Sequence, residues 1–508
     1  AAEPQAYVKI ETSENYDIYL TTHQGIVTVT TPDTLVDGVI SGLKTSSESV
    51  TPEKGISVTG RGSVSLNEAE FTDELRDLIN VDKTVFNNKV EIFAGDASLD
   101  AADFEKVNTL YLEDITSTDV SYNLSLITPQ VFTDKQIFEK QTTELFTGFS
   151  SDQILTEIEV VDTTGFELVA HDAHWENSPS EEVGYLKFIG QDENSNPVTE
   201  IIKYWSKDAT KFYGDPNNGG IIERSVFRSG LVTTTGTTDS DTASAVEEYV
   251  YIDLAVGKLL IALLTGDLYG QVGKTLPAHW HAGITPDFVN LTSFEEIGFD
   301  LWNPNDSSGF HLRIDNLNAT NSKNFIAREI LRVASLVFLT DVNGEIAAKR
   351  YSQVIQGAST VTVLDDNDLT NKPSFNRKSG DIKNIFSVSW DYDQAAQKFN
   401  RHEVFNDPES QARNGVISGA DVIRLKTVRN NQVEVGDLLK TVTDGIRTRL
   451  TNAKLTPSIT TNFRRSASLE LMDVIGLDLT GFADYSDAGD INRPFEIQSI
   501  QHDWLNRS

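Results

Sequence analysis

The segment IFSVSWDYD, residues 385–393, carries a clear strand signal. Its apolar residues Phe386, Val388 and Trp390 alternate with serines, which is the period of two that gives a strand one apolar face. A strand of this kind needs a core on one side only, because serine tolerates solvent on the other. The segment therefore predicts a β-rich fold in this part of the chain.

Similar patterns continue toward the C-terminal end. The runs SITTNF, SLELMDVIGLDLTGF and PFEIQSIQHDW predict further strands. Before them, Leu438, Val442, Ile446 and Leu450 recur at helical spacing, which predicts one helix. Residues 376–508 are therefore interpreted as a β-barrel or sandwich domain that carries a helix.

The first 130 residues have the same character. GISVTGRGSVSLNEAEF alternates over much of its length, and Gly60 and Gly62 interrupt it as glycines do at the bulges and bends of barrels. KVEIFAGD and VNTLYLEDIT resemble two more strands, and Thr72 is placed to cap a short helix. Residues 1–130 are predicted to form a small antiparallel barrel or sandwich with one helix.

Residues 131–250 are interpreted as a β-rich accessory domain. A helix is expected from Thr133 to Gly148, where Ile137, Phe138 and Leu145 share one side. Alternation from Ile154 to Val160, followed by Thr164-Gly165, predicts a hairpin. The polar run VTTTGTTDSDTAS predicts a linker or mobile loop near 232–245.

Residues 251–375 predict a mixed α+β domain. A helical pattern over 252–264 ends at Gly266, and a second helix starts after Asn321-Ser322. Asn343-Gly344 is typical of a type I′ hairpin turn. The predicted fold class is thus multidomain α+β and β-rich, with two helix-bearing β-barrel or sandwich domains flanking smaller mixed ones.

Composition limits the possible functions. The 508 residues suffice for about three to four domains. The absence of cysteine excludes disulfides, thiolate metal sites, cysteine nucleophiles and iron–sulfur clusters. The net charge of −34 repels phosphate, and either simple solubility or a channel wall that lets DNA slide would account for it. No apolar run is long enough to span a bilayer, and no signal peptide is visible at the start.

Short motifs do not build a reactive site. In GDLYGQVGKT, residues 266–275, Leu268 stands where a P-loop needs glycine, and a helix precedes the loop instead of following it. Two histidine pairs, His171 with His174 and His279 with His281, could each supply two metal ligands, but no third ligand is identifiable. We therefore expect these residues to be polar or half-buried histidines in loops.

The run Asp365-Asp366-Asn367-Asp368 lacks the glycine and glutamate of an EF-hand. A polar turn is expected there, with an irregular calcium site left open. The basic pair Arg464-Arg465 is interpreted as an intersubunit ion-pair partner or a solvated face. The chain contains no GxSxG and no HExxH motif. No catalytic, cofactor-binding or metal-binding residue is therefore predicted, no cofactor is expected, and the chain is not expected to be an enzyme.

Three segments carry a resemblance to a known family. They are KTLPAHWHAGITPDFVNLTSFE, FNRKSGDIKNIFSVSWDYDQAAQKF and VFNDPESQARNG. They resemble segments of the baseplate or tail hub proteins of long-tailed, siphovirus-like bacteriophages, which are similar to the hubs of contractile tails and type VI secretion spikes. A Leu-Asp-x-Gly-Asp-Val-Val-x-Leu phrase of that family is similar to LELMDVIGLDLTGF, with Met472-Asp473 in place of Gly-Asp.

The resemblance implies a homotrimeric structural protein of the virion. Each copy would carry two tube-like β-barrel domains, so that three copies form a ring matching the six-fold tail tube. The expected partners are the distal tail protein or tail tube ring, the tape measure protein, and tail tip or fibre proteins. DNA would pass through the bore without specific binding. The expected location is the tail tip of the virion, after synthesis in the host cytoplasm.

Two other classes of function remain open on the sequence. A carbohydrate-binding or adhesin subunit would need exposed aromatic platforms, for which Trp175, Trp205 and Trp302 are the candidates. A hub-associated hydrolase would need an added catalytic domain, and the predicted strands leave no room for one before Ser508.

Overall fold

The computed structural model describes 4–11, 17–23, 26–27, 34–36, 38–44, 48–51, 56–58, 60–67, 87–118, 121–129, 133–170, 182–239, 243–268, 273–300, 311–315, 318–350, 362–378, 380, 382–393, 398–417, 421–428, 449–451, 454–462, 469–483 and 490–501. The helix predicted at Thr72 lies outside these residues, as does most of the helix predicted from Leu438 to Leu450.

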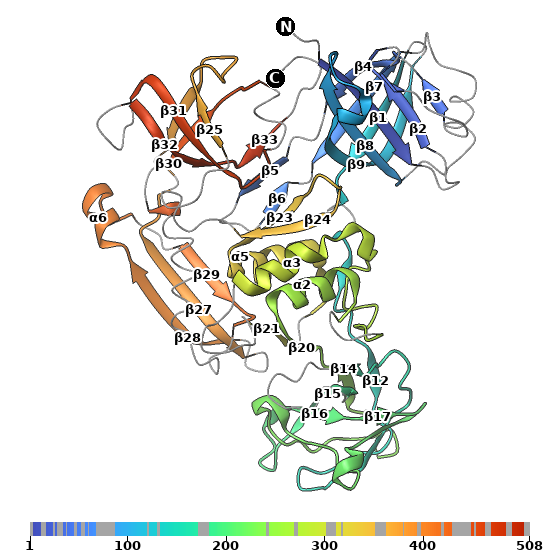
Figure 1. The fold of residues 1–508 in the computed structure, drawn as a ribbon. Coiled ribbons are helices and arrows are strands. Elements are labelled where there is room, and N and C mark those ends of the chain that lie inside the picture. The colour runs from blue at the N-terminus through green and yellow to red at the C-terminus, as the bar shows by residue number, and fades with distance from the viewer. Residues whose placement is uncertain are drawn as a thin grey trace.

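The N-terminal lobe is one sheet of eight strands that curls around its own core (Figure 1). Alternate residues such as Val8, Ile92 and Leu124 face that core and are fully buried. The strand order is β3-β2-β1-β8-β9-β10-β7-β4, antiparallel except for the β2–β3 pair. The strands are β1 (Pro4–Glu11), β2 (Asp17–Thr21), β3 (Thr34–Val36), β4 (Ile40–Lys44), β7 (Arg61–Asn67), β8 (Lys89–Asp96), β9 (Glu105–Ser117) and β10 (Ser121–Ile127), with a 3-10 turn η4 (Ala101–Asp103).

The central region holds helices α2 to α5. Helix α2 is almost wholly buried and ends at Gly266, whose φ of 94° is a left-handed stop. The helix predicted after Asn321-Ser322 is confirmed as α4. Asn321 caps it by accepting the N–H of Asn324, and the helix continues through a π-helical segment. The elements are β20 (Tyr251–Ala255), α2 (Val256–Thr265), η8 (Pro286–Phe288), α3 (Leu291–Asp300), β21 (His311–Asp315), β22 (Thr320–Asn321), α4 (Ser322–Phe325), η9 (Ile326–Leu331), α5 (Arg332–Ala334), β23 (Leu336–Thr340) and β24 (Ile346–Arg350).

The hairpin predicted around Asn343-Gly344 is confirmed as β23–β24, but its turn is not type I′. That turn requires positive φ at both central residues, and only Gly344 has it, at 76°. Asp341 instead shapes a longer loop, because its Oδ1 accepts the N–H groups of Asn343 and Glu345 at 2.9 Å each.

The helix predicted from Thr133 to Gly148 is wrong. This stretch contains β11 (Gln136–Ile137), which pairs with β22, and β12 (Thr142–Glu144), which pairs with β19 (Ala245–Glu248). Phe138 has a φ of 64°, which breaks any helix there. Ile137, Phe138 and Leu145 are buried as expected, but Ile137 and Phe138 lie in the central core and Leu145 lies in the core of the accessory lobe. Their helix-like spacing is therefore produced by short strands that run from one lobe to the next.

The accessory lobe lies at the end of the molecule away from the N-terminal lobe (Figure 1). The hairpin predicted across Thr164-Gly165 is wrong, because β13 pairs with β18 and β14 pairs with β15. The polar run after Leu231 is built into the fold: Val232 is fully buried, and Thr234 N–H bonds Phe149 O at 2.9 Å. Besides β12 and β19, the elements are β13 (Glu157–Glu159), β14 (Val169–Ala170), β15 (Glu182–Gln191), β16 (Pro197–Tyr204), β17 (Ser206–Lys207), β18 (Lys211–Tyr213), η6 (Pro216–Asn218) and η7 (Val226–Arg228).

The C-terminal part forms two groups of strands with separate cores. The predicted strand 385–393 is confirmed as β27, and its inner residues Phe386, Val388 and Trp390 pack on the central helices. Its sheet has the order β28-β27-β29. The second group has the orders β25-β31-β32 and β26-β30 around a core of its own. The elements are β25 (Thr362–Asp365), β26 (Ser374–Lys378), β27 (Ile385–Asp393), β28 (Lys398–Asn406), α6 (Pro408–Asn414), β29 (Asp421–Leu425), β30 (Lys454–Ser458), β31 (Val474–Ala483) and β32 (Asp490–Glu496).

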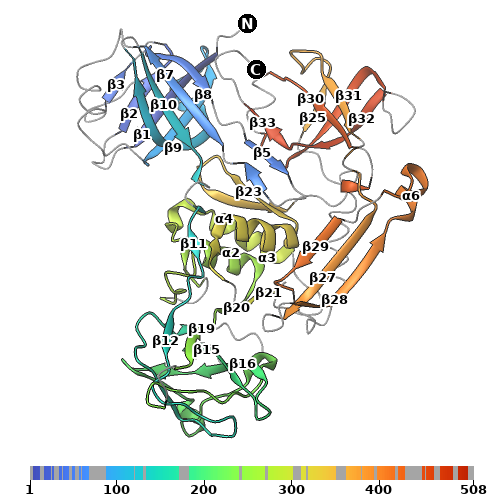
Figure 2. The same ribbon diagram turned by 180° about the vertical axis from the view of Figure 1, so that it is seen from behind.

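One small sheet joins the two ends of the sequence. Strands β5 (Glu48–Thr51) and β6 (Ile56–Val58) pair with each other, and β33 (Ser499–Ile500) pairs with β5. This sheet lies between the N-terminal lobe and the C-terminal strands in both views (Figures 1 and 2). The fold is thus β-rich and multidomain, with α2 to α5 gathered in the middle and α6 at the outer end of the C-terminal strands.

Candidate functional site

The glycine loop after α2 does not form a phosphate cradle. Helix α2 precedes it, and the loop closes on itself because Leu276 N–H bonds Gly266 O at 2.7 Å. Lys274, which a P-loop would aim at phosphate, is ion-paired with Glu182 of the accessory lobe. Residues 269–272 of the motif lie outside the described part of the chain.

The histidines of 279–281 serve packing and an inter-lobe contact. His279 Nε2 lies 2.8 Å from Glu248 Oε2, which joins the central region to β19. Burial, with the nearby Lys135 ammonium, lowers the pKa of His281. Among the described residues no group of three or more His, Asp or Glu side chains could hold a metal ion, and His171 and His174 lie outside them.

The aspartates at 365–368 shape a turn, as expected. Asp365 accepts the N–H of Asn367 at 2.7 Å, and Asp366 accepts both the N–H and the hydroxyl of Thr480. Hydrogen bonds from Thr480 hold the pKa of Asp366 below its usual value. These carboxylates therefore tie β25 to β31. Arg464 and Arg465 fall outside the described residues.

An adhesin would need exposed aromatic platforms. Of the three candidate tryptophans, Trp205 lies in the described part of the chain, and Trp175 and Trp302 lie outside it. Trp205 is half-buried, and Lys203 Nζ lies 4.6 Å from its ring centroid. Its apolar surface is thus partly used within the accessory lobe.

The contacts that decide the architecture lie where the lobes meet, and the β23–β24 hairpin is at their centre. Its loop docks on β9 of the N-terminal lobe: Lys106 Nζ donates to Asn343 at 2.8 Å, and Thr109 Oγ1 donates to Val342 O at 2.8 Å. The Tyr111 hydroxyl donates to Gly344 O at 3.1 Å, in a fully buried position. Burial, with Glu345 and Asp341 nearby, raises the pKa of Tyr111.

The other end of the same hairpin docks on the C-terminal strands. Lys349 Nζ donates to Asp473 Oδ1 at 2.7 Å and to Glu470 at 3.3 Å. Val337 of β23 packs against Leu471 and Met472 in a small buried cluster. The hairpin therefore holds the N-terminal lobe with its loop and the C-terminal strands with its stem.

Met472 has a φ of 70°, in the left-handed region. Glycine adopts this conformation at no steric cost, whereas a residue with a Cβ does not. Met472 therefore places a side chain at a turn that favours glycine, and this side chain is buried against Val337 and Leu471. The turn is held because Met472 N–H bonds Ile497 O at 2.8 Å.

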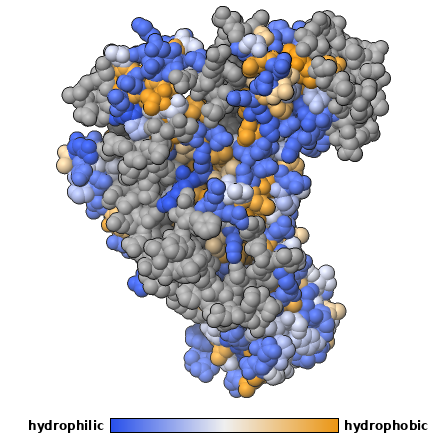
Figure 3. Space-filling model, viewed as in Figure 1, coloured by the Kyte–Doolittle hydropathy of each residue, from blue (hydrophilic) through white to orange (hydrophobic). Residues whose placement is uncertain are grey.

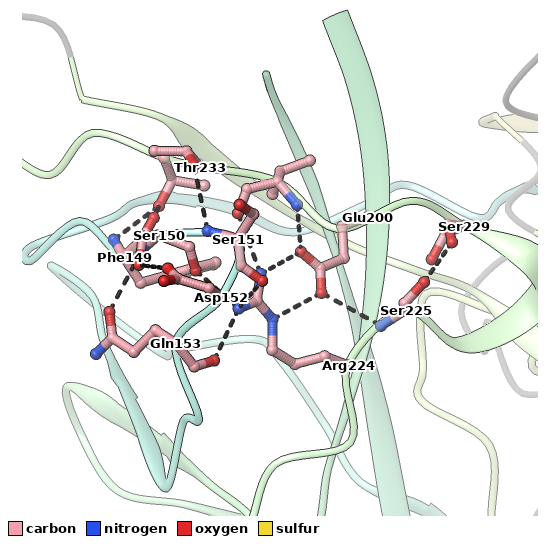
Figure 4. A network of polar contacts seen from close by, with 12 residues as sticks. Phe149, Ser150, Ser151, Asp152, Gln153, Glu200, Arg224, Ser225, Ser229 and Thr233 are labelled. Carbon is pink, nitrogen blue, oxygen red and sulfur yellow. Dashed lines mark hydrogen bonds and ion pairs between the residues drawn. The ribbon is translucent and has the colours of Figure 1, made fainter. Parts of the chain in front are cut away.

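A buried ion pair organises the loops of the accessory lobe (Figure 4). Glu200 is fully buried and meets Arg224 in a bidentate pair, at 2.8 Å and 2.7 Å. The remaining donors of Arg224 reach the carbonyl groups of Ser150, Gln153 and Val232. Because a buried ion pair is stable only when its hydrogen bonds are satisfied, this network holds the loops at 150–153 and 231–233 together.

Cation–π contacts also join the accessory lobe to the central region. Arg313 of β21 lies 4.5 Å from the ring centroids of both Phe227 and Tyr251. At the end of the same strand, Asp315 is buried, and this burial, with the Asp393 carboxylate, raises its pKa to about 7. The central region, the accessory lobe and β27 thus meet at one partly charged junction.

Sequence reasoning did not anticipate these junction residues. The junction pair Lys349–Asp473 consists of ordinary charged residues in an acidic chain, and so does the buried pair Glu200–Arg224 inside the accessory lobe. No spacing rule links partners so far apart in the sequence. The turn signal at Asn343-Gly344 marked the hairpin but not its docking.

On the face drawn in Figure 3, the described residues are mostly hydrophilic, with apolar patches on the two upper lobes and in the middle. Of the helices in the described ranges, none is both long and apolar enough to cross a bilayer.

No family model matches the chain, and no curated protein matches it. Among solved structures, it is similar to the tail protein from Neisseria meningitidis MC58, with 9% identity, 98% of this chain and 91% of that chain covered, and a TM-score of 0.41. The prophage tail protein gp18 from Listeria monocytogenes EGD-e gives 9% identity, coverage of 98% and 90%, and a TM-score of 0.40. The 43 kDa tail protein of prophage MuSo2 from Shewanella oneidensis gives 9% identity, coverage of 91% and 89%, and a TM-score of 0.33.

Proposed function

We propose that this chain is a structural, non-enzymatic subunit of a phage tail, acting as the hub at the distal end of the tail tube. Three copies form a ring in the virion, at the tail tip. The observation that carries the proposal is the small β33–β5–β6 sheet, which ties the N-terminal lobe to the C-terminal strands by backbone hydrogen bonds.

A ring needs its repeating parts at a fixed angle. Within one copy, the backbone pairing of β5 with β33 and the docking of the β23–β24 hairpin both oppose rotation between the two β-rich parts. Three copies of two β-rich parts give six positions, which is the symmetry of a tail tube. Such an adaptor contacts the distal tail protein or tube ring on one side and tip or fibre proteins on the other, with the tape measure protein in the bore.

The acidic excess suits a wall beside passing DNA. A net charge of −34 in each copy repels phosphate, and screening limits this effect to ~8 Å at physiological salt. Carboxylates within that distance of the bore axis would prevent adhesion during ejection. A bore lined mainly by Lys and Arg contradicts this part of the proposal.

The test is the mass and image of the purified chain. Mass photometry should find three copies of 56.1 kDa, about 168 kDa, and electron microscopy should show a ring with a central hole. A stable monomer at micromolar concentration, with no ring on added tail tubes, contradicts the proposal. DNA retention by the ring at physiological salt contradicts the bore assignment alone.

A further inference from the structure

Strand β28 is an exposed edge. It has nine residues and ends its sheet, in the order β28-β27-β29. Seven of the nine are exposed, and Phe399 and Phe405 are half-buried. Both ribbon views place β28 on the outside, with no described element beyond it (Figures 1 and 2). A long exposed edge presents backbone groups that another strand can bind.

The register shows which backbone groups point outward. Asp407 N–H donates to Asn384 O at 3.1 Å, and the next pairs are Ile385 with Asn406 and Ser387 with Val404. Residues of an antiparallel strand alternate between bonding inward and outward. The N–H and C=O groups of Asn406, Val404 and His402 therefore point to the open edge of β28.

The outer face of the sheet adds apolar surface beside this edge. Val404 of β28 and Val422 of β29 both lie opposite Ser387, so the two valines flank it on one face. Each is 49% exposed, which is high for an aliphatic residue in a sheet. A strand added to β28 would cover Val404 and leave Ser387 and Val422 at the rim.

The other described edges are less suited to strand addition. β3 and β25 have three and four residues, β4 is irregular at Gly42, and β32 contains Pro494. β16 has eight residues, but its outer edge already meets Glu223 and Gly230. Within the described part of the chain, β28 is the longest edge strand.

Charge indicates what the edge binds. β28 contains Lys398 and Arg401 against one acid, Glu403, and Arg424 is exposed on the same sheet. The chain as a whole carries −34. A weakly basic edge on a strongly acidic protein is complementary to another copy of that protein.

We infer that the β28 edge pairs, by backbone hydrogen bonds, with a strand of a second copy of this chain. The inference deepens the proposed function, because it rests on the ring and names the surface that closes it. A head-to-tail contact of this kind uses β28 of one copy and a different edge of the next.

Val404→Pro tests the pairing directly. Proline removes an N–H that points to the open edge and so leaves the bonds between β28 and β27 in place. We expect unchanged circular dichroism and a concentration for half-assembly raised by about tenfold or more. Arg401→Glu, which retains every backbone group, should also weaken assembly, and more at low salt than at high salt. Assembly of both variants as in the wild type overturns the inference.

A cross-linking experiment identifies the surface independently of stability. Because the chain has no cysteine, Val404→Cys creates a single labelling site for a benzophenone maleimide. Illumination should give covalent dimers and a cross-linked peptide from a second copy. Ile189→Cys, on a strand of the accessory lobe and 55% exposed, is the matched control and should give none.

The outcomes separate the two proposals. If the wild-type chain forms rings, Val404→Pro leaves them intact and Val404→Cys gives no covalent dimer, the β28 contact is overturned. The proposed hub function is then retained. A wild-type chain that stays monomeric overturns the hub, and the β28 contact with it.

Discussion

Lys349 donates to Asp473 across the boundary between the central hairpin and the C-terminal strands, with Nζ 2.7 Å from Oδ1. Asp473 also accepts the N–H of Glu470 at 2.8 Å, so one carboxylate both shapes its turn and receives the lysine. The contact is one of several that orient the C-terminal strands, together with the packing of Val337 against Leu471 and Met472.

Replacing Lys349 with Met should loosen that boundary. The pair is partly screened, since the lysine side chain is 36% exposed, so the expected loss is about 1 kcal/mol. Hydrogen exchange of the amides at 472 and 497 should accelerate, while the core of β27 stays protected. Arg413→Ala removes the exposed pair with Glu409 and should change neither measurement.

Glycine should be better tolerated than alanine at Met472. Both substitutions lose the packing against Val337, but only glycine relieves the left-handed backbone at φ 70°. We expect Met472→Gly to be more stable than Met472→Ala by about 1 kcal/mol in chemical denaturation. Equal stability of the two variants would show that this turn carries no strain.

Tyr111→Phe should weaken the docking of the hairpin loop on the N-terminal lobe. The change removes the donor to Gly344 O in a buried place, and an unpaired buried carbonyl group costs about 1–3 kcal/mol. Limited proteolysis in the 341–345 loop should become faster. Tyr213→Phe, at an exposed hydroxyl bonded to Asp208, is the control and should leave the digestion pattern unchanged.

Strand patterns were predictable where the residues that bury a strand are its own neighbours. The alternation of Phe386, Val388 and Trp390 is local, so β27 was found with its buried face. The failed helix at 133–148 shows the limit: Ile137 and Leu145 enter different cores, and long-range pairing with β22 and β19 overrode the helical spacing.

The inter-lobe contacts could not be predicted for a related reason. Tyr111 and Gly344 become neighbours only after both lobes have folded, and nothing in the sequence around either residue indicates that they will be in contact. The sequence did show the unusual residue at Met472, but the backbone conformation that explains it is visible only in three dimensions.

Breaking the buried pair in the accessory lobe should be costly. Glu200→Gln leaves Arg224 buried without a counter-charge, for which about 3–5 kcal/mol is expected. Amide protection in the loops 150–153 and 231–233 should fall together, since Arg224 binds both. The control is Lys211→Ala, which removes an exposed pair with Glu157 and should leave the stability almost unchanged.

Asp315 should make stability fall as pH rises. Its pKa is raised to about 7 by burial and then by Asp393, so between the unfolded value and about 7 the folded chain holds more protons than the unfolded one. The penalty is absent in acid and complete above pH 7. Asp315→Asn should therefore gain stability over the wild type at pH 8, by about 2–4 kcal/mol, and little at pH 4.

Urea unfolding of both proteins across that range measures the difference. The stability difference between Asp315→Asn and the wild type must grow between about pH 4 and pH 8. An equal difference at every pH would show that the pKa of Asp315 does not change on folding. Asp393→Asn should reproduce a smaller part of the effect, because it removes only the second cause.

The pairing of β33 with β5 has a consequence for biosynthesis. Ser49 and Ser499 are register partners, so the ribosome must add about 450 residues after the first before the second exists. At ~5–20 residues per second this interval lasts at least about 20 s. During that time β5 and β6 lack their third strand, so the two β-rich parts are joined late, only once nearly the whole of this sequence has been translated.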